Sequence, residues 1–316
     1  MHKILTSWKL IPRSLNGIAI NLMKDIKIAM RNLLCTMLRF LWLYAAIPYL
    51  AVTIIFAVLQ RKLMYQPTTA KNLSTTACNL PPESARDIVI TAADGVKLKG
   101  WLIFASPLEP GGGVQLQRNL VLYFPGNAGN RFQRLDDLRE IAGLGFDVLI
   151  ADYRGYGDSE GRPSQSALQS DARLVWQYAC TQLNYAPQRI VIFGESLGGA
   201  VALSLCPHDS SHHPRPAAVL LNSTFAKMSD VVAWHYPWFP FRYLLLDRWP
   251  SVDCMCQTQI PVVIFHGTAD EIVPYSQAQK LAAASPLARL IKIEGGSHNG
   301  LPFDHLRTEL LRLRTP

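Results

Sequence analysis

Charged residues are scarce in this sequence, and acidic residues are rarest where basic ones gather. Only 17% of the 316 residues are charged and 49% are apolar, which excludes wholesale disorder. Residues 1–39 hold seven Lys or Arg against one acid, Asp25, so a net +6 of the chain's +8 precedes residue 40. A nucleic-acid binder would carry a basic stripe on its folded domain. Here the charge borders an apolar segment, which indicates a membrane as partner and argues against nucleic acid.

Cysteine frameworks and metal-ligand patterns are also lacking. The six cysteines show no spacing typical of a disulfide-rich chain. Cys254 and Cys256 lie two residues apart, but no His or second Cys pair accompanies them at the spacing of a zinc site. The sequence contains neither a GxxxxGK[ST] loop nor a GxGxxG loop after its first strand. We therefore expect no metal and no cofactor.

One long segment has no charge at all. Residues 40–59 (FLWLYAAIPYLAVTIIFAVL) are long enough for a helix to cross about 30 Å of hydrocarbon. A cleaved signal peptide would have a shorter apolar stretch and a small-residue site after it, whereas Gln60-Arg61-Lys62 follow here. The pattern predicts a single-pass signal anchor, with a buried core helix as the alternative. The excess of Lys and Arg before the segment predicts a cytoplasmic N-terminus and a domain on the opposite side, in a periplasm or lumen.

The rest of the chain predicts a linker and one large domain after the basic tail (1–39) and the anchor (40–59). Residues 60–85, rich in Thr, Pro and Ser, predict a linker. Within residues 86–316, two apolar runs flank Ala93-Asp94-Gly95 and predict a hairpin. Short apolar strands then alternate with helix-length stretches, which predicts an α/β fold with a mostly parallel sheet and helices on both faces. The strands are expected at 119–124, 146–153, 189–194, 217–222, 261–267 and 289–295, and the helices at about 131–143, 165–183, 197–206, 274–284 and 302–314.

A nucleophile is predicted where the third of these strands ends. Gly194-Glu195-Ser196-Leu197-Gly198 is a GxSxG sequence between an apolar strand and an apolar helix, the context that a nucleophile elbow requires. The turn is so tight that side chains at the two glycine positions would clash across it. Ser196 is therefore predicted to project its hydroxyl at the carboxyl end of the sheet, with a plain Gly-Ser-Gly turn as the alternative.

The hydroxyl needs a base, and the base needs an orienting acid. In this arrangement the acid follows a late strand and the base follows the last one. Asp270 follows PVVIFHG, and His298 lies on a Gly-rich loop after RLIKI. Asp152, Asp247 and Glu271 are the rival acids. His266 and His305 are the rival histidines, of which His266 is expected to support the acid loop.

An oxyanion formed at Ser196 needs two N–H donors. The first is predicted to be the backbone of Leu197, directly after the nucleophile. The second is predicted to be the backbone of Asn127, in the loop Pro125-Gly126-Asn127-Ala128-Gly129 after the first strand of the series.

These motifs resemble those of a known superfamily. The anchor with QRKLMYQP after it, PGNAGN, DYRGYGDSEGRPS, GESLGG, DRWPS, HGTADEIVP and GGSHNG are similar to the α/β hydrolases, and among them to the N-terminally membrane-anchored serine hydrolases of the bud-emergence-protein and ABHD type. The resemblance covers about residues 40–316 and implies the α/β-hydrolase fold. It departs at Pro125, where the family usually has His. Proline has no N–H to donate, but the donor at Asn127 remains.

The resemblance implies a reaction class more clearly than a substrate, because family members include esterases, lipases, thioesterases and peptidases. We expect a hydrolase that cleaves an ester or thioester bond of a lipid or an acylated protein through an acyl-enzyme. The alternatives are a serine aminopeptidase, which would need an acidic pocket for the substrate amine, and a non-catalytic membrane scaffold. Residues 226–256, rich in aromatics, are predicted to form either a cap over the site or a helical excursion packed on the domain.

Overall fold

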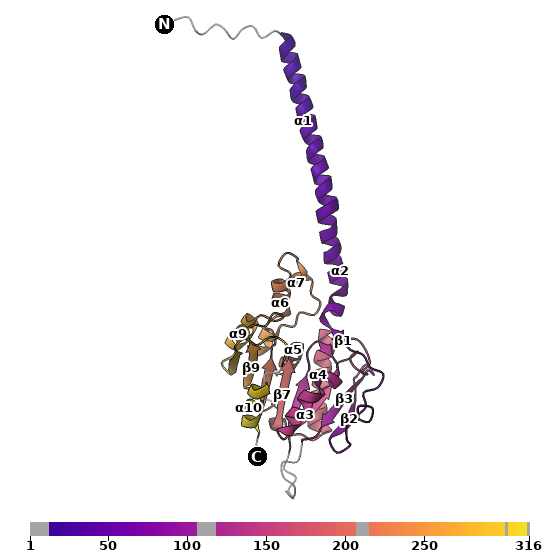
Figure 1. Cartoon of the computed structure of the whole chain (residues 1–316), viewed down its shortest axis with the longest axis vertical. Helices are drawn as coiled ribbons and strands as arrows, with labels where there is room; N and C mark the ends of the chain where they lie inside the picture. The colour runs from indigo at the N-terminus through magenta and orange to yellow at the C-terminus, as the bar shows by residue number, and fades with distance from the viewer. Residues whose placement is uncertain (1–12, 106–117, 207–214, 301–302, 315–316) are drawn as a thin grey trace, which may run out of the picture. The chain divides into compact units, whose positions relative to one another are not determined.

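The computed structural model describes residues 13–105, 118–206, 215–300 and 303–314 (Figure 1). The chain divides into two compact units, Met1–Phe56 and Ala57–Pro316. Helix α2 (Ile47–Met64) contains the boundary between them. We call the second, which contains the predicted catalytic residues, the catalytic unit.

The first unit is helical throughout its described part. It comprises α1 (Arg13–Leu41), the π-helical turn η1 (Trp42–Ala46) and the beginning of α2. The stretch Ile20–Met64 is long and apolar enough to cross a membrane, with a mean hydropathy of 2.1 in its most apolar part. The predicted tail over residues 1–39 therefore differs in one respect: from Arg13 on it is helix. Residues 13–39 contain no Pro and only one Gly, so little interrupts the helical hydrogen bonds. Residues 1–12 lie outside the described residues.

Pro48 explains the π-helical turn. Proline has no N–H to bond the carbonyl four residues earlier, and its ring crowds that carbonyl, which here belongs to Tyr44. The backbone widens locally, and the N–H of Ile47 donates to the carbonyl of Trp42, five residues before it. A π-turn of this kind accommodates the proline without ending the helix.

An eight-stranded sheet forms the centre of the catalytic unit. Its order is β2-β3-β6-β4-β7-β8-β9-β10. The hairpin β2–β3 is antiparallel, as predicted, and β3 also runs antiparallel to β6, while the other neighbours are parallel. The strands are β2 (Ala85–Thr91), β3 (Lys97–Ile103), β4 (Asn119–Phe124), β6 (Phe146–Ala151), β7 (Ile190–Glu195), β8 (Ala218–Asn222), β9 (Val262–Gly267) and β10 (Ala288–Ile293).

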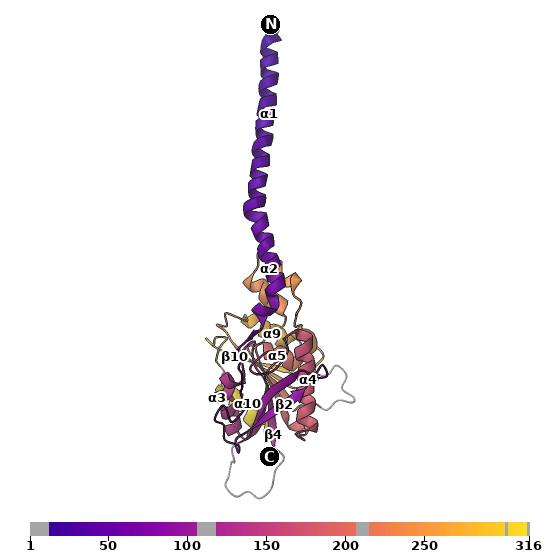
Figure 2. The ribbon, with the colours of Figure 1, turned by 90° about the vertical axis from the view of Figure 1, so that its right-hand side faces the viewer.

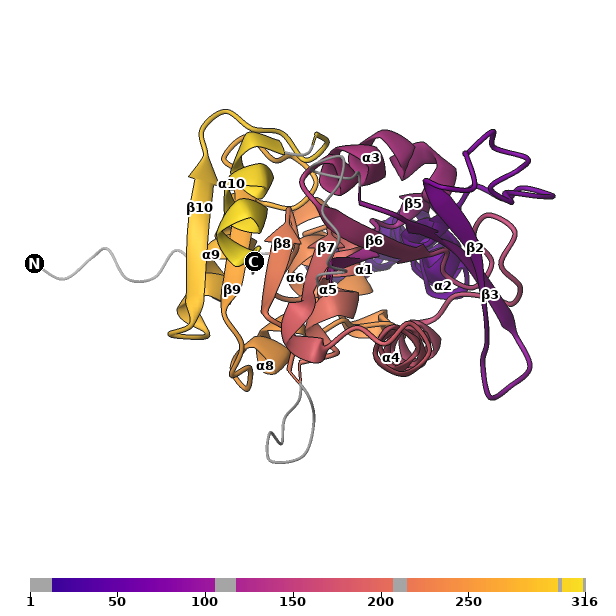
Figure 3. The same ribbon diagram turned by 90° about the horizontal axis from the view of Figure 1, so that it is seen from below.

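Helices cover both faces of this sheet, because side chains alternate between the faces along each strand. On β4, Leu120 and Leu122 face one apolar core, and Val121 and Tyr123 face the other. The first core also contains α4, α5, α8 and α9, and the second contains α3 and α10; Figure 3 shows α3 and α10 opposite α4 and α8. These helices are α3 (Leu135–Gly143), α4 (Gln165–Thr181), α5 (Leu197–Leu203), α8 (Ser251–Met255), α9 (Tyr275–Ala283) and α10 (Phe303–Leu313).

Short elements complete the unit. They are β1 (Gln66–Pro67), β5 (Ala128–Gly129), the 3-10 turns η2 (Arg131–Arg134) and η3 (Pro187–Arg189), and the helices α6 (Met228–His235) and α7 (Phe241–Leu244). Strands β1 and β5 pair in parallel. The alternation of strands and helices predicted from residue 119 onward is thus confirmed.

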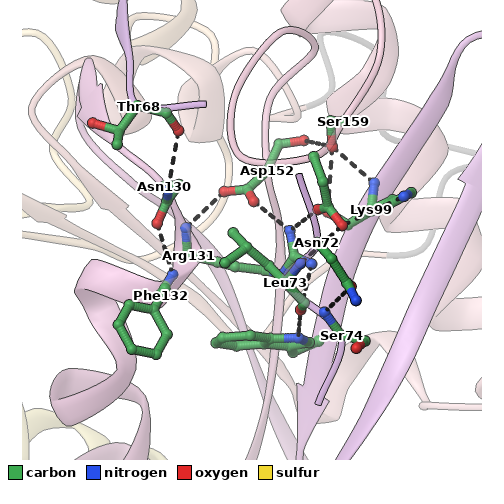
Figure 4. A network of polar contacts seen from close by, with 12 residues as sticks. Thr68, Asn72, Leu73, Ser74, Lys99, Asn130, Arg131, Phe132, Asp152 and Ser159 are labelled. Carbon is green, nitrogen blue, oxygen red and sulfur yellow. Dashed lines mark hydrogen bonds and ion pairs between the residues drawn. The ribbon is translucent and has the colours of Figure 1, made fainter. Parts of the chain in front are cut away.

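The prediction of a linker over residues 60–85 is wrong, because this segment packs against the rest of the catalytic unit. Tyr65, Leu73 and Leu80 are buried. Asp158 accepts the N–H of Leu73, whose carbonyl receives hydrogen bonds from Arg131 and from the indole of Trp101 (Figure 4). A polar composition predicts an exposed segment only if the backbone of that segment has no hydrogen-bond partners within the fold. The backbone of this segment has several.

The centre of this network is a buried arginine. Arg131 forms ion pairs with Asp152 and Asp158, and its guanidinium lies 4.9 Å from the ring centroid of Trp101. Figure 4 shows Arg131 between Asp152 and Leu73. A buried charge is tolerated only when it is paired and hydrogen-bonded. The polar network therefore holds the segment after α2 in one fixed place.

Candidate active site

The elbow predicted at Ser196 forms where β7 meets α5. Ser196 has φ 51° and ψ −113°, a region that costs a non-glycine residue about 1–3 kcal/mol. Neighbouring backbone holds it there, since its N–H donates to the carbonyl of Asn222 and its own carbonyl accepts from the Thr224 hydroxyl. A Cβ on Gly194 would lie 2.5 Å from the carbonyl oxygen of Gly198, and one on Gly198 would overlap Phe124. Both glycines are required by close backbone approach.

The structure brings the predicted base and acid to this serine. His298 Nε2 lies 3.1 Å from Ser196 Oγ, and His298 Nδ1 lies 2.8 Å from Asp270 Oδ2. A carboxylate only accepts, so Nδ1 carries the hydrogen and Nε2 is left to accept the serine proton. The side chain of His298 is 11% exposed and that of Asp270 is fully buried. The three side chains come from three loops at the carboxyl ends of β7, β9 and β10.

A second histidine also contacts Asp270. His266 Nε2 lies 3.2 Å from Asp270 Oδ2 and 2.8 Å from the carbonyl oxygen of Val273. Both are acceptors, so Nε2 carries the hydrogen. The expectation that His266 supports the acid loop agrees with this geometry. Its direct contact with the carboxylate was not predicted, although the i,i+4 spacing of the two residues was visible in the sequence.

Asp270 is held as a carboxylate. Burial acts to raise its pKa, but hydrogen bonds from His266, His298 and the N–H of Val273 outweigh it and lower the pKa below the usual range. A further N–H, from Ile272, donates to Oδ1. The group facing His298 is therefore negatively charged and fixed in direction before any substrate binds, which suits a residue that orients an imidazole.

The rival residues lie elsewhere. Asp152 pairs with Arg131, and Asp247 accepts hydrogen bonds from Arg61 and Tyr65. His305 is exposed on α10. None of these three appears in a contact with Ser196 within the described part of the chain.

The predicted oxyanion loop borders the nucleophile. A Cβ built on Gly126 would lie 3.7 Å from the Cβ of Ser196. Asn127, the next residue, is held on both sides: its carbonyl accepts from the N–H of Gln66 and the hydroxyl of Tyr156, and its side-chain amide donates to the carbonyl of Met64. Leu197 begins α5 directly after Ser196. The contacts from Met64 and Gln66 were missed from the sequence, because residues 60–85 were expected to be a linker.

Charged groups also lie directly beneath the elbow. Glu195 accepts hydrogen bonds from Tyr123 and Arg134, each at 3.1 Å. Partial burial, and next the negative charge of Glu195, raise the pKa of Asp137 on α3 to about 6. Two carboxylates thus share one cation, Arg134, close to the nucleophile.

Replacing Asp137 by asparagine should stabilise the protein at neutral pH but not at acidic pH. The folded-state pKa of about 6 lies above the unfolded value of about 4, so ionisation costs stability as pH rises between them. After allowance for partial exposure, the gain above pH 6 should be on the order of 1 kcal/mol and should vanish below about pH 4. Unfolding of the full chain in detergent, followed from pH 3.5 to 8, measures it.

Asp136→Asn is the matched control, since Asp136 lies in the same helical turn with its side chain 97% exposed. A gain of equal size in both variants, or a gain from Asp137→Asn that persists at pH 3.5, would contradict the assignment of the cost to Asp137.

The aromatic residues in and directly before the predicted cap segment, residues 226–256, divide into two groups. Phe225, Phe241 and Trp249 are buried, and Phe239 is half-buried. Trp234, Tyr236, Trp238 and Tyr243 are exposed. One half of the aromatic set thus packs on the unit, and the other half faces outward.

The fold is that of an α/β hydrolase, and the predicted residue His298 lies within hydrogen-bond distance of both Ser196 and Asp270. A family model described as "Serine aminopeptidase, S33" matches residues 117–253. Protein bem46 of Schizosaccharomyces pombe is 30% identical over 247 residues, which cover 74% of this chain and 79% of that protein. The α/β-hydrolase domain-containing protein WAV2 of Arabidopsis thaliana is 30% identical over 263 residues, covering 76% and 81%. An uncharacterized protein of Mycobacterium tuberculosis is 40% identical over 241 residues, covering 76% and 80%.

Solved structures agree on the fold. The esterase Pf2001 of Pyrococcus furiosus superposes with a TM-score of 0.59 at 17% identity, over 79% of this chain and 97% of that one. An α/β hydrolase of Vibrio vulnificus gives 0.62 at 18% identity, over 77% and 87%. The chain belongs to the α/β-hydrolase superfamily and, within it, to the group of bem46-type proteins, as its motifs predicted. It is a hydrolase.

Proposed function

We propose that this protein is a membrane-anchored serine hydrolase that cleaves a carboxylic ester or thioester through an acyl-enzyme. The observation that carries the proposal is the position of the His298 ring, with Nε2 3.1 Å from Ser196 Oγ and Nδ1 2.8 Å from Asp270 Oδ2. A serine hydroxyl becomes a nucleophile when a base in this position takes its proton.

The reaction proceeds in two halves. Ser196 Oγ attacks the carbonyl carbon while His298 Nε2 takes the hydroxyl proton, and Asp270 stabilises the resulting imidazolium. The negative oxygen of the tetrahedral intermediate accepts hydrogen bonds from the backbone N–H groups of Leu197 and Asn127. The bond to the leaving group then breaks, and that alcohol or thiol leaves with the proton from His298. Water, activated by the same histidine, attacks the acyl-serine ester and releases the acid.

An aminopeptidase is the second candidate, because the matching family model carries that description. It would need a free carboxylate near the site to bind a substrate amine. The three acids of residues 226–256 each have a cation near them: Asp230 pairs with Lys280, Asp247 with Arg61, and Asp253 lies 3.9 Å from Lys227. This pairing favours an acyl substrate without a charged amine.

The membrane anchor is the other part of the proposal. It is supported by the apolar helix Ile20–Met64 and by the basic residues that precede residue 40. That charge favours a cytoplasmic N-terminus with the catalytic unit in a periplasm or lumen. Protease digestion of sealed vesicles tests the orientation, since the catalytic unit should be protected from protease on the cytoplasmic side.

Substrates in or on the membrane are favoured. The segment after the anchor is fixed within the catalytic unit, so the distance between this unit and the membrane is short. Lipids and acylated proteins are therefore the proposed substrate classes. On p-nitrophenyl esters from acetate upward, kcat/KM should rise at most about fourfold per added methylene and then level off.

Two other assay outcomes would overturn parts of this proposal. Hydrolysis of acetate alone, with longer chains excluded, would contradict the preference for acyl chains. Faster cleavage of aminoacyl anilides than of any ester would favour the peptidase. Ser196→Ala is the blank for both assays.

A further inference from the structure

Most of the exposed large apolar side chains described in the catalytic unit gather at one end. Six of them lie within residues 234–246, and Val58, Leu59 and Leu63 lie on the last turns of α2. The most exposed are Trp238 (84%), Tyr243 (69%) and Leu246 (65%). Contiguous exposed apolar surface of this kind marks an interaction site. We call the set of six the aromatic patch: Trp234, Tyr236, Trp238, Tyr243, Leu244 and Leu246.

Hydrogen bonds fix this patch to the end of the membrane helix. Gln60, which is buried, donates to the carbonyl of Leu244 at 3.1 Å and accepts the N–H of Leu246 at 2.7 Å. Arg61 donates twice to Asp247, at 2.9 and 3.1 Å. Figures 1 and 2 show α6 and α7 beside the end of α2 from two directions. The patch therefore lies at the level of Gln60, the first residue after the predicted span 40–59.

The composition of the patch is that of a membrane interface. Trp and Tyr concentrate where hydrocarbon meets headgroups, because their rings are apolar and their N–H or O–H groups bind water. Basic residues surround it: Lys62, Arg242 and Arg248 are exposed, and the Arg242 guanidinium lies 4.8 Å from the ring centroid of Tyr243. Such cations are attracted to anionic phosphate headgroups.

The patch is also connected to the active site. His235, which adjoins Trp234 and Tyr236, has its Nε2 2.9 Å from the carbonyl oxygen of Ile272. The N–H of Ile272 donates to Asp270. A surface seated in headgroups would thus lie two hydrogen bonds away from the acid that orients His298.

We propose that the aromatic patch inserts into the headgroup region of the phospholipid bilayer that α2 crosses, and so presents the active site to acyl substrates in that bilayer. This inference rests on the proposed membrane anchor. The anchor holds the unit at the membrane, and the patch sets which face of the unit meets the lipid. The occupant is the bilayer itself, because the patch is continuous with the end of the span and carries complementary charge.

Tryptophan quenching in lipid nanodiscs tests this with the full chain. Nanodiscs contain phosphatidylglycerol and phosphatidylcholine brominated high on the acyl chain, which quenches indoles near the interface. Trp238→Phe should remove quenched emission, whereas Trp176→Phe, a change on α4 away from the patch, should remove only unquenched emission. Trp42, the third residue of the predicted span 40–59, lies near the first end of that span and reports on the anchor, so Trp42→Phe should also remove quenched emission in the same discs.

The outcomes separate the two claims. If Trp42 is quenched and Trp238 is not, the patch does not enter the bilayer and this inference fails while the anchor stands. If neither is quenched, the membrane anchor itself fails. If Trp238 is shielded because two copies meet at the patch, cross-linking in discs that hold two chains reveals it, and the inference is again overturned.

Activity provides a second readout. Replacing Trp238, Tyr243 and Leu246 together by serine should lower turnover of an acyl ester dissolved in the bilayer by about tenfold or more, since interfacial binding scales with buried apolar area. Turnover of water-soluble p-nitrophenyl acetate should not change. Leu311→Ser, which alters an exposed leucine on α10, should affect neither substrate. Equal loss on both substrates would mean that the triple variant damages the fold rather than the docking.

Discussion

His298→Ala should lower kcat/KM by about a thousandfold to a millionfold, the range found when the base of a serine triad is removed. The His298 ring lies within hydrogen-bond distance of both Ser196 and Asp270. Without it, nothing takes the serine proton as the C–O bond forms, and nothing returns that proton to the leaving group. The effect should fall mainly on kcat, because the imidazole acts in the transition state. Steady-state kinetics on a p-nitrophenyl ester measures it.

His305→Ala is the matched control, since His305 is exposed on α10 and should leave kcat/KM within about twofold. The assignment would be wrong if His305→Ala proved as damaging while His298→Ala kept its activity. Circular dichroism and thermal unfolding of both variants separate loss of chemistry from loss of fold.

Asp270→Asn should lower kcat about ten-thousandfold, as loss of the triad carboxylate does in serine proteases. An amide can present its NH2 group to His298 Nδ1, which then accepts, so the hydrogen moves to Nε2 and the ring can no longer take the serine proton. The carbonyl of asparagine can still accept the N–H groups of Ile272 and Val273, so the loop should keep its shape. Rates in single-turnover assays report this chemical step.

Glu271→Gln serves as the control for that variant, because Glu271 is the adjacent carboxylate and is exposed. It should retain nearly full activity.

The pH dependence of folding stability provides a second test of the assignment of Asp270. Because the pKa of Asp270 is lowered in the fold, its ionised form stabilises the protein above about pH 4, and this contribution is lost as pH falls through the folded-state pKa. The stability deficit of Asp270→Asn should therefore shrink in acid, and a deficit that grows would contradict the assignment.

The sheet and its helices were predictable because their signals are local. Residues 190–193 form a short apolar run directly before GxSxG, and this pattern depends on a few neighbouring residues. The positions of Asp270 and His298 followed from strand order, since parallel strands deliver their carboxyl ends to one edge of the sheet. Their 2.8 Å contact results from the two loops meeting at that edge of the sheet. No local sequence pattern around either residue indicates it.

The segment after the predicted anchor was not predictable in the same way. Its composition is that of a linker, yet its order comes from partners far along the chain. Leu73 is held by residues 28 to 85 positions away, and Asp247 lies 186 positions from Arg61. Such long-range contacts produce no periodic pattern in the sequence. The same holds for the aromatic segment, where Trp249 is buried and Trp238 is exposed although both are tryptophans in one short stretch.

The central claim is that Ser196 is the nucleophile, and covalent labelling tests it most directly. The full-length protein in detergent is treated with a fluorophosphonate, which phosphonylates only an activated serine, and the modified peptide is identified by mass spectrometry. The account predicts one adduct, on Ser196, that is absent from Ser196→Ala and strongly slowed in His298→Ala. Labelling of the wild type at another serine, or equal labelling of Ser196→Ala, would contradict it.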